Sequence, residues 1–407
     1  MRVCRIQLLL LFFLASIFGL AAQETAQEVA QAGAPGITPE IMSKAAALYD
    51  FETGTLLYEK NGDERIPPAS MTKLMTLHLA FNAINRGELS LDTTMRVGPG
   101  DDFSHMPRRS SLMFIEEGQS VTLLQLMRGL AVPSGNDAAY MLARLVSGSV
   151  EAFVEVMNRE ARRLGFENIY FEEPAGLSAK NYVTAKEFAL FCREYIRLHP
   201  ESLELLHNQA EFTYPPRGAV SQGAPSSYGP ITQENYNILI GRHPWVDGLK
   251  TGYIDESGYN IALSARTGER RVVAVVMGGP GENSREGALS RAIDGVNLIS
   301  YGFYHFTRVE PQFPQLESVR VHRSVQGRIP VRVHAAEPLV LPLDTAARLE
   351  VRYEIDTPLA APLAAGTVVG QARISSAGRL IRSYPIVLEE EAVLGNWWQQ
   401  LVDSLLQ

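Results

Sequence analysis

The stretch that decides the fold is Pro67-Pro68-Ala69-Ser70-Met71-Thr72-Lys73. Its two prolines end an extended segment, because proline fixes φ and has no N–H donor. The apolar positions between Leu74 and Ile84 recur at helical spacing, which predicts a mostly buried helix with Ser70 in its first turn. Side chains three positions apart share one face of a helix, so we expect Lys73 to reach Ser70.

The segments around this helix alternate between strand and helix patterns. Two apolar runs flank Glu52-Thr53-Gly54 and predict a β-hairpin. Residues 121–205 are predominantly helical, with a break at Pro133-Ser134-Gly135. β-branched runs on either side of Thr267-Gly268 predict a second hairpin, and one long helix follows it over residues 284–306. The expected class is therefore α+β, an antiparallel sheet flanked by helices with a helical subdomain.

Composition changes beyond this part of the chain. Residues 309–390 alternate apolar and polar side chains between Gly and Pro positions, which predicts a small all-β domain after a first domain over residues 37–308. Residues 391–407 predict an amphipathic helix that is too short to span a bilayer. Its apolar stripe consists of Leu394, Trp397, Trp398, Leu401, Val402, Leu405 and Leu406. We interpret it as an anchor at a membrane surface, with docking on the protein or a partner as the alternative.

The first residues have the layout of a secretory signal peptide. Arg2 and Arg5 precede a run of apolar residues, and small residues follow it, so residues 1–22 are expected to be removed after Ala21 or Ala22. An uncleaved anchor is the alternative. Cleavage would also remove Cys4 and leave one cysteine, Cys192, which excludes an internal disulfide and which we expect to be a buried packing residue.

Length and charge set further bounds. The 407 residues are 46% hydrophobic and 20% charged, which is typical of a globular protein with room for two domains. The formal net charge is −8. An acidic balance disfavours nucleic acid as a partner, because no surplus of basic side chains is available to neutralise phosphates.

Two further tripeptides complete a chemical pattern with Ser70 and Lys73. Ser134-Gly135-Asn136 lies at the break between helices, and Lys250-Thr251-Gly252 lies in a predicted strand. Serine is a poor nucleophile until a nearby base removes its proton, and lysine acts as a base only when burial or another cation lowers its pKa. Lys73 is expected to deprotonate Ser70, and Lys250 to be the second cation.

The order S-x-x-K, S-x-N and K-T-G is the signature of penicillin-binding proteins and serine β-lactamases. The blocks around the three motifs, between about Ala45 and Phe306, resemble those of low-molecular-mass penicillin-binding proteins that act as serine D-alanyl-D-alanine carboxypeptidases. The resemblance implies removal of the terminal D-alanine from peptidoglycan stem pentapeptides through a Ser70 acyl-enzyme, with β-lactam antibiotics as covalent inhibitors.

The resemblance also implies roles for single residues. Ser134 would relay a proton to the leaving amine, and Asn136 would orient Lys73 and the substrate. Thr251 would bind the substrate carboxylate, with Lys250 contributing charge beside Gly252. Tyr253, where some relatives have histidine, would supply a second oxyanion N–H, and Arg285 would help to bind the carboxylate.

Other functions remain open at this point. Glu172 or Glu173 falls where a class A β-lactamase would need a carboxylate to activate water, but Gly135 replaces the aspartate of S-D-N. A D,D-endopeptidase that cuts peptide cross-links has the same three motifs, and a catalytically silent wall-binding protein is the third alternative. Dispersed histidines disfavour a metallopeptidase, and Asp101, Asp102 and His105 are interpreted as a solvated loop.

The expected cofactor and metal content is therefore none. The expected partners are a stem peptide ending in D-Ala-D-Ala, β-lactams, and a membrane surface reached through the C-terminal helix. The expected location is the periplasmic face of the inner membrane, as a peripheral protein.

Overall fold

The computed structural model describes residues 38–216, 227–314, 316–334, 336–398 and 400–401. The proposed signal peptide, residues 1–22, lies outside the described residues. The chain forms two compact units that meet near residue 305. We describe each unit by itself.

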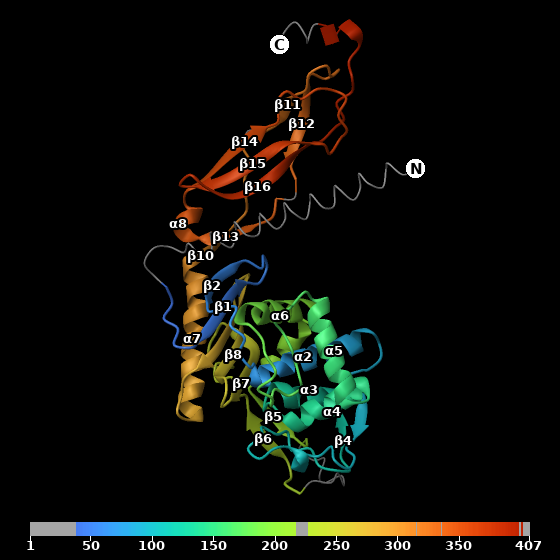
Figure 1. The fold of residues 1–407 in the computed structure, drawn as a ribbon, viewed down its shortest axis with the longest axis vertical. Coiled ribbons are helices and arrows are strands. Elements are labelled where there is room, and N and C mark those ends of the chain that lie inside the picture. The colour runs from blue at the N-terminus through green and yellow to red at the C-terminus, as the bar shows by residue number, and fades with distance from the viewer. Residues whose placement is uncertain (1–37, 217–226, 315, 335, 399, 402–407) are drawn as a thin grey trace. The chain divides into compact units, whose positions relative to one another are not determined.

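The first unit is built on an antiparallel sheet of five strands (Figure 1). In spatial order these are β2 (Leu56–Lys60), β1 (Ala45–Asp50), β9 (Arg270–Gly279), β8 (Gly258–Thr267) and β7 (Val246–Ile254). The two predicted hairpins are confirmed as β1–β2 and β8–β9. Strands β1, β8 and β9 are buried almost throughout because helices cover both faces of the sheet. Strand β7, which carries Lys250-Thr251-Gly252, is an edge strand.

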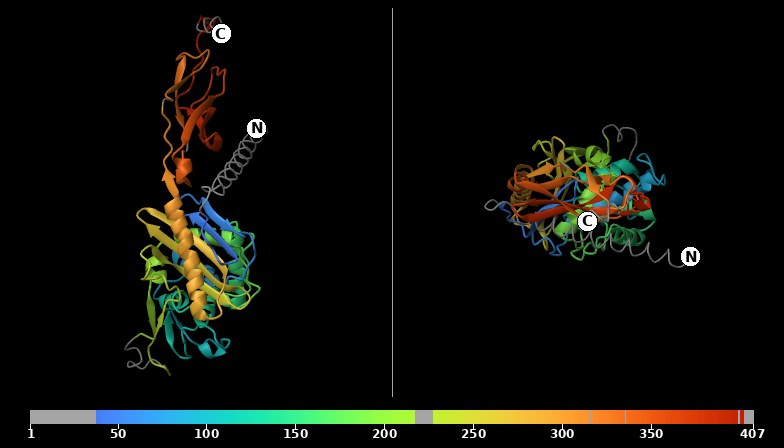
Figure 2. Two further views of the ribbon diagram at one scale, coloured as in Figure 1. Left: turned by 90° about the vertical axis from the view of Figure 1, so that its left-hand side faces the viewer. Right: turned by 90° about the horizontal axis from the view of Figure 1, so that it is seen from above.

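One helix covers one face of the sheet, and the remaining helices cover the other (Figure 2). The first is the predicted long helix, α7 (Ser284–His305), whose Gly295 and Gly302 let it lie against Leu263 and Leu48 of the sheet. The others are α2 (Lys73–Asn85), α3 (Leu123–Ala131), α4 (Asn136–Ser147), α5 (Val150–Arg163) and α6 (Ala185–Leu198). Helix α2 is buried along most of its length and enters the largest hydrophobic core of this unit.

Some elements differ from the sequence prediction. The region 121–205 contains a loop without helix over residues 164–184, which forms one wall of the site described below. Two ribbons of two strands each were not predicted: β3 (Thr94–Arg96) with β4 (Ser120–Thr122), and β5 (Glu211–Tyr214) with β6 (Ile231–Glu234). These strands have only three or four residues each, too few for alternation to stand out from the surrounding loops. Short elements are also described at η1 (Ala69–Thr72), η2 (Phe103–His105) and η3 (Leu203–His207).

The second unit is a β domain, as the alternating pattern predicted. Its antiparallel sheet has the order β11 (Ser318–Arg320), β12 (Arg328–Val333), β16 (Arg379–Leu388), β15 (Val368–Ser376) and β14 (Leu349–Ile355). Strand β10 (Phe306–Val309) pairs with β13 (Leu339–Pro342), which leads into a single helical turn, α8 (Leu343–Ala346). Alternate side chains of β14 point into small apolar cores.

Only part of the predicted C-terminal helix is described. Residues 397, 398, 400 and 401 are helical, whereas residues 399 and 402–407 lie outside the described residues. Trp397 and Trp398 are well exposed, and their rings stack with centroids 4.2 Å apart. Residues 391–396, predicted as the start of the helix, are not helical, and Leu394 forms a β-bridge with Ser324 instead. An amphipathic helix from residue 397 onwards stays a prediction.

Candidate active site

Ser70 lies in the turn η1 immediately before α2, where two glycines allow two other segments to come close. A Cβ atom on Gly176 would lie 1.8 Å from the carbonyl oxygen of Ala69, and one on Gly252 would lie 2.5 Å from that of Pro68. Real Cβ atoms do not come that close to backbone atoms, so both positions require glycine. Gly252 of the K-T-G motif thus lies against the Ser70 turn.

Lys73 is completely buried and makes three polar contacts through Nζ. It donates hydrogen bonds to Ser70 Oγ at 2.9 Å, to Asn136 Oδ1 at 2.7 Å and to the carbonyl oxygen of Ala175 at 2.6 Å. Burial lowers the pKa of Lys73 to about 7, although the carboxylates of Glu173 and Asp137 oppose the shift. A neutral Lys73 amine keeps two N–H bonds to its amide acceptors and directs its lone pair at Ser70 Oγ.

The S-x-N segment lies between α3 and α4. Asp137 holds it in place by accepting hydrogen bonds from the backbone N–H groups of Met113 and Ile115, at 2.8 and 3.1 Å. Ser134 has φ of +61°, a left-handed conformation that is uncommon for serine. Its Oγ atom is buried and has no hydrogen-bond partner in the described part of the chain. A buried hydroxyl without a partner is costly, so it marks a position where a ligand group is expected.

Lys250 is the second buried lysine of this region. Burial lowers its pKa well below the usual value, and the positive charges of Lys73 and Arg291 lower it further. Behind its strand, His207 Nδ1 donates to the carbonyl oxygen of Leu249 at 3.2 Å and the Tyr195 hydroxyl lies 2.9 Å from Nε2. Sequence reasoning missed His207 because a lone histidine carries no motif.

The structure does not bring Arg285 to the site, but brings Arg291 there instead. Arg285 is exposed near the start of α7, and no side-chain contact joins it to β7 within the described residues. Arg291, nearly two turns further along the helix, is 7% exposed and donates to the carbonyl oxygen of Gly252 at 3.3 Å. The signal that distinguishes them is the helical period, because Arg291 shares a face with the buried Gly287 and Gly295.

The two glutamates considered for a β-lactamase are engaged in structural contacts. Glu173 accepts hydrogen bonds from the backbone N–H groups of Ala175, Gly176 and Leu177, at 2.6–2.7 Å. Glu172 bonds to Ser178 and Lys180 instead. Glu173 therefore fixes the loop whose Ala175 carbonyl binds Lys73, which gives it a structural role beside the site.

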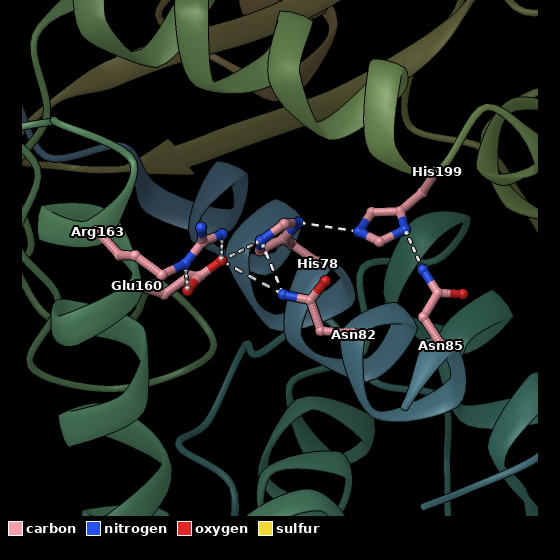
Figure 3. Close-up of polar contacts among 6 residues, drawn as sticks. All are labelled: His78, Asn82, Asn85, Glu160, Arg163 and His199. Atoms are coloured by element: carbon pink, nitrogen blue, oxygen red, sulfur yellow. Dashed lines mark hydrogen bonds and ion pairs between the residues drawn. The ribbon is translucent and has the colours of Figure 1, made fainter. Parts of the chain in front are cut away.

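A buried polar network connects α2 to α5 and α6 (Figure 3). His78 Nε2 donates to Glu160 Oε1 at 2.8 Å, since a carboxylate only accepts. His78 Nδ1 lies 3.0 Å from His199 Nε2, and Asn85 donates to His199 Nδ1 at 3.4 Å. Arg163 binds both oxygens of Glu160 at 2.7 Å. The network fixes the helix that begins at Lys73.

Cys192 is free and buried, as predicted. Asp102 caps the short helix η2 and lies 3.1 Å from His105, while Asp101 pairs with Arg144. Within the described residues, no group of three or more His, Cys, Asp or Glu side chains is arranged to hold a metal ion, and no helix is long and apolar enough to cross a membrane.

Comparisons with known proteins identify the family of the chain. Residues 28–281 match the family model described as D-alanyl-D-alanine carboxypeptidase. The chain belongs to this family. Residues 315–393 match the model of the C-terminal domain of penicillin-binding protein 5. The family assignment makes the chain a serine-type carboxypeptidase by class and confirms the resemblance found in the sequence.

Individual relatives cover most of both chains. D-alanyl-D-alanine carboxypeptidase DacC of Escherichia coli is 31% identical over 90% of this chain and 88% of that protein. DacA of Haemophilus influenzae is 30% identical over 96% of each. The crystal structure of penicillin-binding protein 5 from Haemophilus influenzae has a TM-score of 0.73 and 29% identity, and covers 88% of this chain and all of that one.

A further solved structure concerns ligands. Penicillin-binding protein D2 from Listeria monocytogenes, described in its ampicillin-bound form, has a TM-score of 0.55 and 29% identity, and covers 66% of this chain and all of that one. The α+β fold of the first unit is thus shared with these structures, and the trailing β domain matches that of penicillin-binding protein 5.

Proposed function

We propose that this carboxypeptidase removes the terminal D-alanine from peptidoglycan stem pentapeptides through an acyl-enzyme on Ser70. The observation that carries the proposal is the contact of Lys73 Nζ with Ser70 Oγ at 2.9 Å, together with a pKa lowered to about 7. An amine with that pKa is half deprotonated near neutral pH, which is the condition for an efficient general base.

In the proposed acylation, Lys73 takes the proton from Ser70 Oγ as this atom bonds to the carbonyl carbon of the penultimate D-alanine. The backbone N–H groups of Ser70 and Tyr253 stabilise the oxyanion. The C–N bond then breaks, and Ser134 gives its proton to the amine of the leaving D-alanine while it takes the proton that Lys73 holds, so that Lys73 is neutral again. Asn136, bonded to Lys73, keeps the amine directed at Ser70. Water subsequently hydrolyses the ester and regenerates the free serine.

The substrate carboxylate is assigned to Thr251 and Arg291, with Lys250 as a nearby positive charge. This assignment replaces Arg285 by Arg291, because only the latter contacts the backbone of β7. The terminal nitrogens of Arg291 donate to the carbonyl oxygens of Gly252 and Tyr236, so Arg291 is proposed to attract the carboxylate through its positive charge. In this arrangement β-lactams, which also present a carboxylate beside a reactive carbonyl, acylate Ser70.

The test is intact-mass spectrometry of the protein mixed with benzylpenicillin, followed by product analysis with a D-Ala-D-Ala pentapeptide and its cross-linked dimer. A persistent adduct on Ser70 and release of D-alanine from the pentapeptide are expected. Rapid penicillin hydrolysis without D-alanine release would instead indicate a β-lactamase. Preferential cleavage of the dimer would indicate an endopeptidase.

We also propose that the protein is exported and that its C-terminal segment holds it at the periplasmic face of the inner membrane. The exposed Trp397, Trp398 and Leu401 support this, because tryptophan favours the membrane–water interface. The test is co-sedimentation of the mature chain with phospholipid vesicles. Binding that persists after removal of residues 391–407 would contradict the anchor.

A further inference from the structure

Exposed apolar side chains gather at the end of the β unit that carries the C-terminal segment (Figure 1). In the described part of this unit eight large apolar side chains are well exposed, and six of them belong to this group, with 43–65% of each side chain exposed. The six are Val325, Val393, Leu394, Trp397, Trp398 and Leu401. We call them the apolar tip. Val325 comes from the turn between β11 and β12, whereas the other five belong to the C-terminal segment.

Backbone contacts join the turn to the C-terminal segment. The Val325 N–H donates to the carbonyl oxygen of Val393 at 2.9 Å. Ser324 and Leu394, the neighbouring pair, form an antiparallel β-bridge. In this register Val325 lies opposite Val393, and side chains that lie opposite each other share one side of a ribbon. The two valines therefore form one continuous apolar surface, although they are distant in sequence.

The turn is also fixed by its own hydrogen bonds. The Ser324 hydroxyl donates to the carbonyl oxygen of Val321 at 2.8 Å and accepts from the Gly327 N–H at 2.9 Å. Ser324 is only 8% exposed, whereas Val325, the next residue, is 53% exposed. A turn that is already fixed loses little conformational entropy on binding, so its exposed valine is well suited to contact a partner.

The arrangement of the tip favours lipid over protein as its partner. Neighbouring side chains alternate along a strand, so Leu394 lies on the side of the ribbon opposite to Val393, and both side chains are exposed. A flat protein surface would cover one side of such a ribbon, whereas lipid can surround both sides. The stacked Trp397 and Trp398 add two indole rings, which favour the boundary between water and hydrocarbon.

Electrostatic attraction does not explain binding at this end. The charged side chains that flank the tip in sequence are Arg323, Arg328, Glu389, Glu390 and Glu391, which leave no surplus of positive charge. Anionic headgroups are therefore not attracted, and burial of apolar surface has to supply the free energy of binding. Binding to vesicles of zwitterionic lipid should consequently change little with salt concentration.

We propose that the turn around Val325 enters the membrane–water interface together with the C-terminal segment, so that the β unit contacts lipid at two points. The inference rests on the proposed membrane location. A single contact at the end of the chain would leave the β unit free to turn about that contact. Two contacts that are joined by backbone hydrogen bonds fix the orientation of this unit at the membrane. One valine is too small to hold the protein by itself, so the C-terminal segment stays necessary for binding.

The first experiment is co-sedimentation of the mature chain with phosphatidylcholine vesicles, for the parent and for Val325→Ser. Loss of the apolar surface of Val325 should lower the partition coefficient about three- to tenfold. Leu343→Ser is the matched control, because Leu343 is 51% exposed and belongs to α8, at the opposite end of the β unit (Figure 1). This control should leave the partition coefficient unchanged, and the melting temperature shows whether both variants fold.

The second experiment follows the environment of the turn directly. Cys192 is the only cysteine after residue 22 and is buried, so a cysteine introduced at the surface can be labelled selectively with the dye nitrobenzoxadiazole. The variants are Val325→Cys and Leu343→Cys. Addition of vesicles should shift the emission of the dye at position 325 to shorter wavelength, because the dye leaves water for an apolar environment. The emission at position 343 should not shift.

The outcomes separate this proposal from the membrane anchor itself. Equal vesicle binding by the parent and Val325→Ser, without an emission shift at position 325, would overturn the proposal and leave the C-terminal anchor in place. A dimer of the parent that Val325→Ser abolishes, with vesicle binding unchanged, would show that a second copy of the chain covers the tip and would also overturn it. Failure of the parent to bind vesicles at all would instead refute the proposed membrane location.

Discussion

The two units of this chain differ in whether they bury ionisable side chains. In the first unit the buried side chains include Lys73, Lys250, Arg291, Asp137 and His207. In the described part of the β unit, the polar side chains classed as buried are two serines, Ser324 and Ser376. Burying an ionisable group costs free energy unless partners compensate it. The first unit accepts this cost at several places, and one of them, around the Ser70 turn, is where the chemistry is proposed.

The first way to test this comparison is to remove the buried amine. Lys73→Met keeps the length and apolar stem of the side chain but has no base to accept the Ser70 proton. Loss of a general base typically costs 10²–10⁴-fold, so acylation by benzylpenicillin should slow by about 10³-fold. The measurement is adduct formation followed by intact mass. Far-UV circular dichroism and the melting temperature serve as controls for the fold. Near-normal acylation in a folded variant would refute the assignment of Lys73 as base.

The second prediction concerns the close approach that holds Ser70 in place. Gly176→Ala would place a methyl group 1.8 Å from the Ala69 carbonyl oxygen, so the turn or the loop has to move. A shift of about 1 Å in a reacting group costs about 100-fold in rate, which is the expected loss of acylation. Gly165→Ala is the matched control, because it has the same left-handed φ but open space around it. If both variants lose acylation equally, backbone strain and not the contact is responsible.

The third prediction follows the proton on Lys73 with pH. Because its pKa is lowered to about 7, the amine is increasingly protonated below that value and loses its ability to accept the Ser70 proton. The acylation rate constant for benzylpenicillin should fall about tenfold per pH unit below pH 7 and level off above about pH 8. A rate that keeps rising up to pH 10 would show that the lysine has its ordinary pKa and would remove the physical basis of the mechanism.

These residues also show how far the sequence alone could lead. The motifs around Ser70, Ser134 and Lys250 are each local in sequence. The helix, the helix break and the strand that carry them could therefore be predicted from residue spacing and pattern. The partners that complete the site are remote in sequence. Arg291 was missed because choosing between two arginines on one helix requires knowing which face lies against the sheet. The role of the Glu173 loop was missed because most of the hydrogen bonds of Glu173 come from backbone N–H groups, which the sequence pattern does not reveal.

The fourth prediction concerns how acid changes the stability of the first unit through the buried His207. Burial lowers the pKa of His207 to about 3, whereas an unfolded chain has a histidine pKa of about 6.5. Below pH 6.5 this histidine therefore binds a proton in the unfolded state but not in the folded state. The free energy of unfolding consequently decreases as the pH falls towards 3. Between pH 7 and pH 5 this histidine should lower the free energy of unfolding by about 2 kcal/mol.

The measurement is urea denaturation at both pH values for the parent and for His207→Asn. The loss of stability between the two pH values should be about 2 kcal/mol smaller in the variant. His105→Gln serves as the control for removal of a histidine, because that side chain is more than half exposed. An identical pH dependence in the parent and in His207→Asn would contradict the prediction.

The smallest effects come from two arginine–glutamate pairs with the same shortest distance. Arg163 in the first unit and Arg373 in the β unit both lie 2.7 Å from a glutamate oxygen. In the β unit both partners are substantially exposed, so Arg373→Ala should change the free energy of unfolding by about 0.5 kcal/mol or less. In the first unit Glu160 is only 11% exposed and also accepts from His78, so Arg163→Ala leaves a buried acceptor partly unpaired and should cost about 1–3 kcal/mol. Equal changes in the free energy of unfolding, measured by urea denaturation, would mean that exposure of the arginine decides the contribution and burial of its glutamate partner does not. The proposed difference between the two units would then not hold for these two ion pairs.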